Sequence, residues 1–437
     1  MAELTQLFHS SLTKMSETRH NSLFTSILAY SATNLLNAAI PFLLLPVLTN
    51  AMNPSDYGIL AMFQVLFNLL IPVAAFNSES ALSRYYFDKD LKGFEKMLGA
   101  SLRLLAGSSA LMAILLILFS GIIEKYSGFP AAWLWSVLVF VTGRKLIEIV
   151  LTMYRVENKA LSFATVRILS TLADIALSIL LAVNLNMGWE GRIHGQVWSA
   201  VLFGIIALII IKYRFKADFR KSTAHRNLLL DFGLPLLPHA MGAVIITYSD
   251  RLFISGMSGL EAAGIYAVGY QIGMLVFLFQ NSFNQAWAPW FFEQLNRDDE
   301  NTKKRIVRIT WLYSIGLLSG SIVFGLLSPL LLEYFISPDY GAASDFVFWV
   351  ALGFAFNGIY KMFVNYLFYI KETKAIGVAT FSTAILNLIL NYFFIQRFGA
   401  IGAAYSTALC FLIQLVWIAI LATKKYSMPW LNFIAQK

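Results

Sequence analysis

Charged side chains and cysteine are scarce in this 437-residue chain: Asp, Glu, Lys and Arg make up 13% of it, and cysteine occurs once. Soluble domains carry about 25% charged and roughly 45–50% apolar residues, whereas 58% of this chain is hydrophobic. A soluble protein of this length could not bury so much apolar surface, so lipid must be the solvent for most of the chain. A cytosolic enzyme, a nucleic-acid binder and a disordered protein are therefore excluded.

Motifs that carry chemistry are also missing. A single thiol cannot form a disulfide framework or a thiolate zinc site, and Cys410 lies inside an apolar run. The sequence has no phosphate-binding loop, no HExxH and no G-x-S-x-G, and its hydrophilic loops are short. The first 20 or so residues are polar, so we expect no cleaved signal peptide. We expect no enzyme, no metal and no cofactor.

Long apolar runs are what the sequence does have. A membrane helix needs about 20 mostly apolar residues, and Pro235 and Pro238 are expected to bend the seventh run. We predict an all-α polytopic membrane protein with about 12 transmembrane helices. The runs fall near 24–49, 57–82, 99–122, 130–153, 161–185, 194–211, 228–255, 263–291, 307–328, 343–370, 375–396 and 400–422.

The distribution of Lys and Arg predicts the orientation. The net charge is +9, which in a soluble protein would suggest nucleic acid. If the N-terminus is cytoplasmic, the inner segments hold 26 of these cations, and the outer ones hold only Lys125, Arg192 and Arg397. Cytoplasmic loops of membrane proteins carry such an excess. We therefore expect both termini in the cytoplasm and no nucleic-acid partner.

The chain also repeats itself. Residues 157–160 (ENKA) return as 372–375 (ETKA), an offset of 215, and Gly58-Ile59 returns as Gly264-Ile265, an offset of 206. Each offset spans six helices, so the two halves would cross the membrane in the same direction. We predict an N-terminal half over 1–212, a basic cytoplasmic linker over 213–226 and a C-terminal half over 227–437. Chance similarity between apolar segments is the alternative.

Two parallel six-helix halves are a transporter architecture, with a cavity that opens to either side in turn. That analogy does not name the cargo.

Charged residues inside the fourth run are the first candidates for a site. A charge at the bilayer centre costs about 2.5–3.5 kcal/mol on insertion scales, so those that persist usually face a cavity or a partner. Arg144, Lys145 and Glu148 lie midway along this run, and Arg144 and Glu148 share a helix face. Arg suits a phosphate because its planar fork binds two oxygens. The alternative is an internal Arg144–Glu148 ion pair.

The tenth run carries a matching polar stripe. Asn357, Lys361 and Asn365 are four residues apart, and the 215-residue offset relates position 361 to position 146, close to Arg144. A cation would then lie near the same depth in both halves and face an anionic cargo. Alternatively, Lys361 snorkels toward the cytoplasm.

Neutral amides suit sugar hydroxyls in a cavity, and serve equally well as hydrogen-bond links between helices. The candidates are Asn34, Asn37, Gln271, Gln280, Asn281, Asn284, Asn387 and Asn391. At the inner end of the second run, Arg84 stands beside two tyrosines. It could meet a lipid headgroup or serve as an ordinary interfacial anchor.

Three more charges complete the candidates for ion coupling or ion pairing, together with Glu148. Asp174 in the fifth run could carry a coupling proton, but neutralisation of Arg144 or Lys145 is favoured. Asp250 and Arg251 are adjacent in the seventh run. Because adjacent helical residues do not face each other, we expect each of them to pair with another helix and to fix the structure.

Three segments carry a recognisable pattern: PFLLLPVLTNAMNPSDYGILAMFQV at 41–65, SALSRYYFD at 80–88, and GLPLLPHAMGAVIITYSDRLFISGMSGLEAAGIYAVGYQ at 233–271. They resemble the polysaccharide transport family, the O-antigen flippases of the multidrug/oligosaccharidyl-lipid/polysaccharide (MOP) exporter superfamily. The resemblance covers nearly the whole chain, and the Asp-Arg pair of the third segment is its most specific feature. It implies a V-shaped pair of six-helix bundles, as in the MATE and MOP transporters.

The resemblance also implies an activity. The cargo would be an undecaprenyl-diphosphate-linked oligosaccharide, turned from the inner to the outer leaflet of a bacterial inner membrane. Arg144 and Lys361 match the family's cationic lumen by position, and a proton or sodium gradient is the driving force often invoked. The implied partners are the lipid-linked oligosaccharide and membrane lipids, with a polysaccharide polymerase and chain-length machinery left open.

Two alternatives remain at this point. The first is a cation-coupled multidrug exporter of the same superfamily. Related drug antiporters often carry an acid in the first helix, where this chain has Asn34 and Asn37. The second is a membrane polysaccharide polymerase or glycosyltransferase, which would need a substantial loop with catalytic acids.

Overall fold

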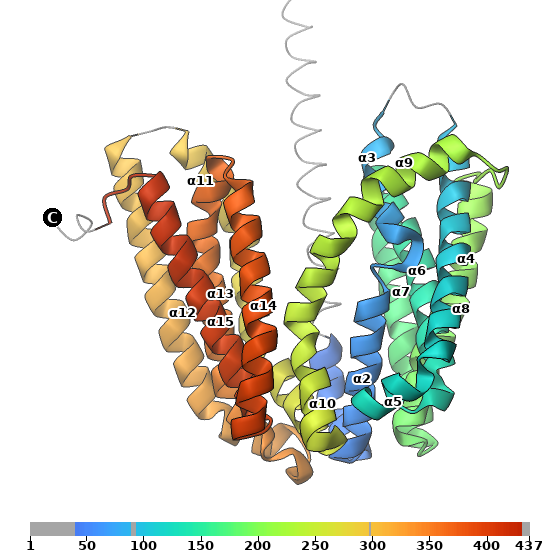
Figure 1. The fold of residues 1–437 in the computed structure, drawn as a ribbon, viewed down its shortest axis with the longest axis horizontal. Helices are drawn as coiled ribbons and strands as arrows, with labels where there is room; N and C mark the ends of the chain where they lie inside the picture. Colours follow the sequence, from blue (N-terminus) through green and yellow to red (C-terminus); the bar gives the residue numbers. More distant parts are fainter. Residues whose placement is uncertain (1–39, 89–92, 297–298, 431–437) are drawn as a thin grey trace, which may run out of the picture. The chain divides into compact units, whose positions relative to one another are not determined.

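The computed structural model describes residues 40–88, 93–296 and 299–430, and within those ranges it consists of helices and turns with no β-strand (Figure 1). The predicted all-α fold is confirmed. The expected site residues Asn34 and Asn37 lie outside the described residues.

The helices of the first half of the chain follow the expected apolar runs. The first described helix is Ile40–Ala51. The helices that follow it in this half are α2 (Pro54–Leu70), α3 (Ser78–Tyr85), α4 (Phe94–Leu118), α5 (Ser120–Ser127), α6 (Leu134–Val156), α7 (Ala160–Ser178), α8 (Gly188–Ile209) and α9 (Thr223–Gly233).

Longer helices make up the second half. A short 3₁₀ turn at Leu234–Leu236, which contains Pro235, separates α9 from the next helix, as the prolines predicted. The helices of the second half are α10 (Leu237–Gly273), α11 (Leu275–Leu295), α12 (Glu300–Phe335), α13 (Ala343–Tyr369), α14 (Thr373–Phe398) and α15 (Ile401–Lys425).

Among the described residues, eight helical segments are long and apolar enough to span a membrane, or nine if α2 and the helix after it form one broken span. One of the eight, Ala240–Leu295, is 56 residues long and contains most of the seventh and eighth expected runs. The chain reverses inside it at Gly259, whose φ of 92° and ψ of 169° are not helical. Only glycine adopts that conformation without strain. The described helices thus agree approximately with twelve spans.

Two glycines related by the 206-residue offset bring α2 and α10 into close contact. A Cβ atom on Gly58 would lie 2.0 Å from the carbonyl oxygen of Leu260, and one on Gly264 would lie 1.9 Å from that of Pro54. Pro54 and Leu260 are themselves 206 residues apart, so the contact is reciprocal. Small residues allow such close approach of helices in membranes.

The chain divides into two compact units. Unit 1 contains Met1–Leu44, Leu70–Leu115 and Trp135–Leu237, and unit 2 contains Leu45–Leu69, Leu116–Leu134 and Pro238–Lys437. Unit 2 therefore includes most of α2, together with α5, from the first half of the sequence. The predicted division into halves at a linker over 213–226 stays a prediction.

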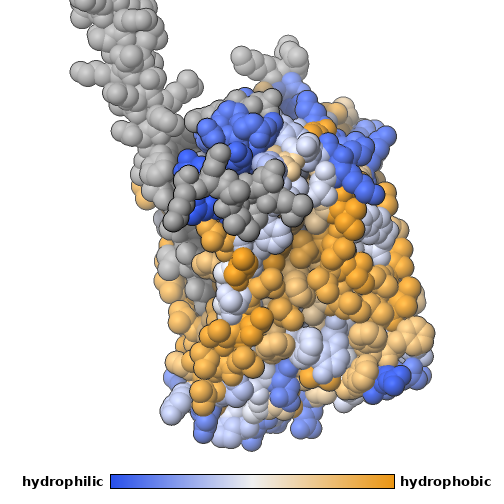
Figure 2. Space-filling model, turned by 90° about the vertical axis from the view of Figure 1, so that its left-hand side faces the viewer, coloured by the Kyte–Doolittle hydropathy of each residue, from blue (hydrophilic) through white to orange (hydrophobic). Residues whose placement is uncertain are grey.

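In unit 2, α13 packs against α11, α12 and α15. Trp287, Phe291 and Tyr366 lie in the buried cluster between these helices. The outward side of α12 instead exposes large apolar side chains such as Leu326 and Leu330. On the face of the molecule that Figure 2 shows, hydrophobic side chains form a band between hydrophilic ends. A lipid-facing surface accounts for that pattern.

In unit 1, the second span is broken between α2 and α3. Ala75, Phe76 and Asn77 all have φ between 52° and 56°, in the left-handed region. Each non-glycine residue there costs roughly 1–2 kcal/mol. The break is held by neighbours, because the Ala75 N–H donates to Ser108 Oγ at 2.9 Å. In addition, a Cβ on Gly233 would lie 2.0 Å from the Phe76 carbonyl oxygen, so α9 packs directly on the break.

Candidate functional site

Lys145 is buried in unit 1 between two carboxylates. Its Nζ lies 2.9 Å from Glu79 Oε1 on α3 and 3.1 Å from Glu148 Oε2 one turn along α6. The Lys145 and Glu79 side chains are 2% and 12% exposed, whereas Glu148 is 47% exposed. The second oxygen of Glu79 is buried without a hydrogen-bond partner. Lys145 is therefore neutralised by acids of its own unit and joins α3 to α6.

Arg144 lies next to Lys145 but has different surroundings. Its guanidinium carbon is 5.8 Å from the ring centre of Phe140, and the nearby charges of Asp174, Glu148 and Arg192 act on it electrostatically. Within the described part of the chain, Arg144 makes no hydrogen bond or ion pair. The Arg144–Glu148 pair that its spacing allows does not form, because Glu148 binds Lys145 instead.

Asp174 pairs with Arg192, which the sequence interpretation had assigned to an outer loop. Its Oδ1 lies 2.5 Å from Arg192 Nη1, and Ser178 hydrogen-bonds to both side chains. Asp174 therefore forms its ion pair with Arg192 and not with Arg144 or Lys145, although its charge also acts favourably on Arg144. The physical reason is that α8 begins at Gly188, six residues before the expected run, so Arg192 lies on a helix that packs against α7.

The polar stripe of α13 faces α11 within unit 2. Asn357, Lys361 and Asn365 lie on successive turns of α13, and each makes a side-chain hydrogen bond with α11. This arrangement favours interhelical hydrogen bonding as the role of the amides. The three contacts are Gln280 Nε2 to Asn357 Oδ1 at 3.2 Å, Lys361 Nζ to Asn281 Oδ1 at 3.1 Å and Asn365 Nδ2 to Asn284 Oδ1 at 3.3 Å.

Lys361 has only neutral partners in this ladder. Besides Asn281, its Nζ lies 5.1 Å from the ring centre of Phe277. No carboxylate of the described residues lies within 4 Å of it. An ammonium has three donors, so two of them have no acceptor in that part of the protein.

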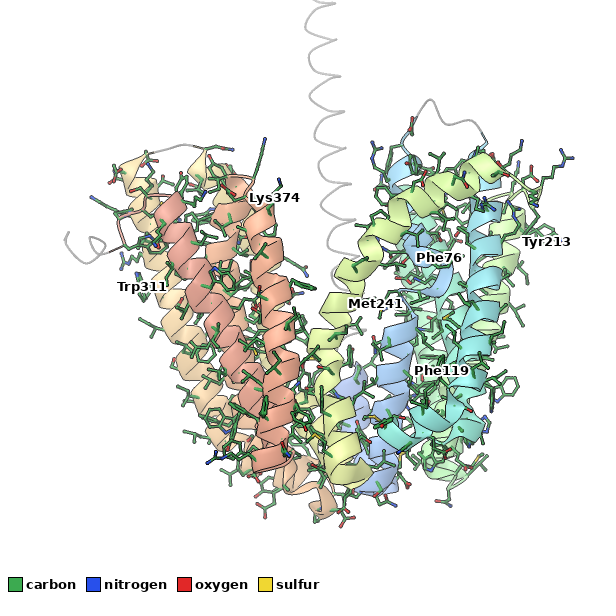
Figure 3. All side chains as sticks on the ribbon, viewed as in Figure 1. Phe76, Phe119, Tyr213, Met241, Trp311 and Lys374 are labelled. Atoms are coloured by element: carbon green, nitrogen blue, oxygen red, sulfur yellow. The ribbon has the colours of Figure 1, made fainter. Side chains whose placement is uncertain are left out.

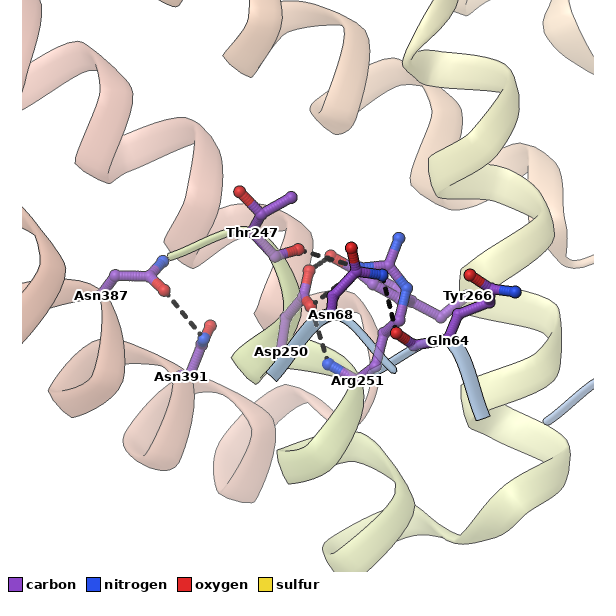
Figure 4. A network of polar contacts seen from close by, with 8 residues as sticks. All are labelled: Gln64, Asn68, Thr247, Asp250, Arg251, Tyr266, Asn387 and Asn391. Atoms are coloured by element: carbon purple, nitrogen blue, oxygen red, sulfur yellow. Dashed lines mark hydrogen bonds and ion pairs between the residues drawn. The ribbon is translucent and has the colours of Figure 1, made fainter. Parts of the chain in front are cut away.

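Asp250 and Arg251 form a buried network on α10 (Figure 4). Asp250 Oδ1 accepts the backbone N–H of Arg251 at 2.8 Å and lies 3.4 Å from its Nη1. The expectation that Asp250 and Arg251 each pair with another helix is wrong as far as their ion pair is concerned, because the two residues pair with each other. It fails because the short Asp side chain turns back onto the N–H of the next residue and thereby meets its guanidinium.

Aromatic side chains complete that network across the chain reversal at Gly259. The Tyr266 hydroxyl donates to Asp250 Oδ2 at 2.5 Å, and the Arg251 guanidinium lies 4.2 Å from the ring centre of Tyr270. The network therefore ties the two arms of α10 together, and Arg251 is held by its own unit.

The remaining sequence candidates are distributed as follows. Gln271 Oε1 accepts from the Tyr57 hydroxyl at 3.2 Å, which links α10 to α2. Arg84 is exposed in the last turn of α3 and makes no ion pair within the described residues. Over 40–88, 93–296 and 299–430, no three His, Cys, Asp or Glu side chains are grouped to hold a metal ion.

Glu79 is the residue of this region that the sequence interpretation missed. It lies in the second apolar run, where an acid is itself a signal of function or pairing. Its partner is 66 positions away on another helix, and one sequence holds no signal for that pairing.

A family model described as "Polysaccharide biosynthesis protein" matches residues 23–295, and a second, MatE, matches residues 235–393. Among curated relatives, "Probable flippase AglR" of Haloferax volcanii is 24% identical over 371 residues, which are 82% of this chain and 75% of that protein. A Shigella flexneri protein named as an O-antigen transporter is 22% identical over 55% of this chain and 58% of its own length.

Among solved structures, the lipid II flippase MurJ in an inward closed conformation matches with a TM-score of 0.67 and 17% identity. The match covers 94% of this chain and 95% of that one. At this identity the likeness concerns the fold alone.

Proposed function

Because the chain belongs to the polysaccharide biosynthesis protein family of the MOP exporter superfamily, we propose that it is a flippase for an undecaprenyl-diphosphate-linked oligosaccharide. The cargo would be an O-antigen or another surface polysaccharide repeat unit, moved across the bacterial inner membrane. The names of two relatives, a flippase and an O-antigen transporter, support the class of cargo. The apolar helices support a multi-pass membrane transporter.

The observation that carries the proposal is the contrast between two sets of cations inside the helices. Lys145, Arg192 and Arg251 each have a carboxylate within 3.4 Å. For Arg144 and Lys361, the described residues supply none within 4 Å. A cation inside the membrane is costly unless an anion compensates it. A diphosphate, with about two negative charges, is such an anion.

The same contrast disfavours the multidrug exporter. A cationic drug would need unpaired acids. Asp174 and Asp250 are each paired with an arginine, and Glu79 and Glu148 both bind Lys145, so the one acid in excess there lies near Arg144. In our proposal Arg144 binds two phosphate oxygens with its fork, and Lys361 acts as a compact point charge. The α13 amides Asn357 and Asn365 hydrogen-bond to Gln280 and Asn284 of α11, on either side of Lys361.

Genetic complementation tests the proposal. Arg144→Ala and Lys361→Ala are each made in a strain that lacks its own flippase for the same polymer, and surface polymer is measured together with protein level in the same membranes. A lost charge-assisted hydrogen bond costs about 1.5–3 kcal/mol, or roughly 10- to 100-fold in cargo binding. We expect little surface polymer at normal protein level, and partial activity for Arg144→Lys, which keeps the charge without the fork.

The matched controls are Arg397→Ala and Lys371→Ala, which remove exposed cations that have no carboxylate partner among the described residues. They should leave surface polymer unchanged. Normal polymer from well-expressed Arg144→Ala and Lys361→Ala would refute the assigned roles.

A further inference from the structure

The segment between α8 and α9 forms a cationic surface on unit 1. We call it the cationic platform and define it by five exposed side chains: Lys212, Arg214, Lys216, Arg220 and Lys221. The helical span Gly188–Arg214, which is 27 residues long and apolar enough to cross a membrane, ends within the platform. The platform therefore begins where that span leaves the hydrocarbon.

The backbone of the platform is fixed on α4. The Asp218 N–H donates to the Glu95 carbonyl oxygen at 2.8 Å, and Arg103 Nη1 donates to the Phe219 carbonyl oxygen at 2.7 Å. A Cβ atom on Gly99 would lie 1.9 Å from the Asp218 carbonyl oxygen, so the two backbones touch. The cations are thus presented by an ordered segment, and less conformational entropy is lost when they bind an anion.

Three of the five cations have neither an acidic partner nor a ring contact in the described chain. Arg214 pairs with Glu157 at 3.0 Å, and Lys212 lies over the ring of Tyr213. Lys216, Arg220 and Lys221 make no ion pair within the residues that the structure covers. The acid of the segment, Asp218, uses its Oδ1 to accept the backbone N–H of Arg220. Positive charge is therefore left for an external anion.

Exposed aromatic rings accompany the charge. Tyr213 is 70% exposed and Phe219 51% exposed, whereas Phe215 between them is buried against Tyr154. Figure 3 shows Tyr213 projecting from the edge of the fold at this end of unit 1. Tyrosines at this level sit among lipid headgroups, and lysine and arginine clusters just outside a membrane helix attract anionic lipids.

We propose that the cationic platform binds the phosphate of an anionic phospholipid in the leaflet beside it. A free phosphate ion offers nothing to the exposed rings, and a zwitterionic lipid offers no net charge to the three unpaired cations. The inference concerns a lipid that stays in its leaflet, and it holds whatever cargo the protein moves.

The test is a lipid titration of the purified full-length protein at low salt, followed by native mass spectrometry. Phosphatidylglycerol should bind at least tenfold more tightly than phosphatidylcholine. Each cation near an anionic surface contributes roughly fivefold, so Lys216→Gln/Arg220→Gln/Lys221→Gln should lower phosphatidylglycerol affinity by up to about 100-fold. Phosphatidylcholine affinity should not change.

The matched control, Lys371→Gln/Lys374→Gln/Lys424→Gln, removes three exposed cations from unit 2 and should keep the preference. Gly99→Ala retains every charge but displaces the platform, so it should weaken phosphatidylglycerol binding severalfold. If that variant does not fold, Arg103→Lys, which loses one anchor without losing charge, replaces it.

Equal affinity for the two lipids, or an unchanged preference in the platform variant, would overturn the proposal. Undecaprenyl diphosphate and inorganic phosphate are added as competitors. Displacement of phosphatidylglycerol by equimolar undecaprenyl diphosphate would assign the platform to the cargo and also overturn it. Retention of phosphatidylglycerol against both competitors supports a structural lipid.

Discussion

The two neighbouring cations on α6, Arg144 and Lys145, should differ in how much their replacement by methionine changes the stability of the protein. Lys145 is buried between Glu79 and Glu148, while Arg144 has no acidic partner in the described chain. Removing one member of a buried ion pair typically costs about 3–5 kcal/mol, because the other charge is left uncompensated. We predict that Lys145→Met lowers the free energy of unfolding and that Arg144→Met does not.

The contribution of each carboxylate follows from its exposure. In the proposed cargo cavity Glu148, which is 47% exposed, is solvated by water, so its share is that of a surface pair, about 0–1 kcal/mol. Glu79 is 12% exposed, and its second oxygen already lacks a partner. Most of the loss in Lys145→Met should therefore come from Glu79, roughly 3 kcal/mol at the lower end of the range for buried pairs.

The assay is thermal unfolding of the purified variants in detergent, together with their abundance in membranes. Lys145→Met should melt several degrees below the unmodified protein, and Glu79→Gln/Lys145→Met should recover most of the difference, since neither position 79 nor position 145 then carries a charge. The reasoning is refuted if Lys145→Met is as stable as the unmodified protein. It is also refuted if Arg144→Met is destabilised to the same extent.

Two further predictions concern helix packing and topology. Gly264→Ala places a Cβ 1.9 Å from the Pro54 carbonyl oxygen, so it should destabilise the protein by about 1–3 kcal/mol in the same melting assay. Gly107→Ala, where no atom lies within 4 Å of the added Cβ, should be neutral or slightly stabilising; equal melting of the two variants would contradict the packing at Gly264. Reporter fusions near residues 220, 300 and 430 should read cytoplasmic and those near 127, 259 and 398 periplasmic, and a periplasmic signal at 220 would invalidate the two-half topology.

Much of the fold could be predicted because lipid imposes simple constraints on a sequence. Apolar runs from position 57 onward coincide with helices or closely spaced helix pairs, and Pro235 marks the turn before α10. The break after α2 was not predicted, although Pro72 lies directly before it and a proline inside an apolar run can break a helix. The left-handed conformation of Ala75, Phe76 and Asn77 depends on Ser108 and Gly233, which lie far along the chain.

The candidate site could be predicted in composition but not in pairing. The sequence identified Arg144 and Lys361 as charges inside helices, because such charges are rare there. It could not show that Glu148 would bind Lys145 instead of Arg144, since i+3 and i+4 neighbours are equally accessible on a helix. The Asp174–Arg192 pair was missed because the start of α8 was placed too late.

Leaflet exchange in proteoliposomes tests the central claim most directly. The purified protein is reconstituted with an undecaprenyl-diphosphate-linked oligosaccharide in both leaflets, and an added glycosidase that cannot enter the vesicles cleaves the sugars it can reach. The account predicts that cleavage proceeds from about half to nearly all of the oligosaccharide with the unmodified protein and stops at half with Arg144→Ala/Lys361→Ala. Complete cleavage with that double variant, or cleavage stopping at half with the unmodified protein, would contradict it.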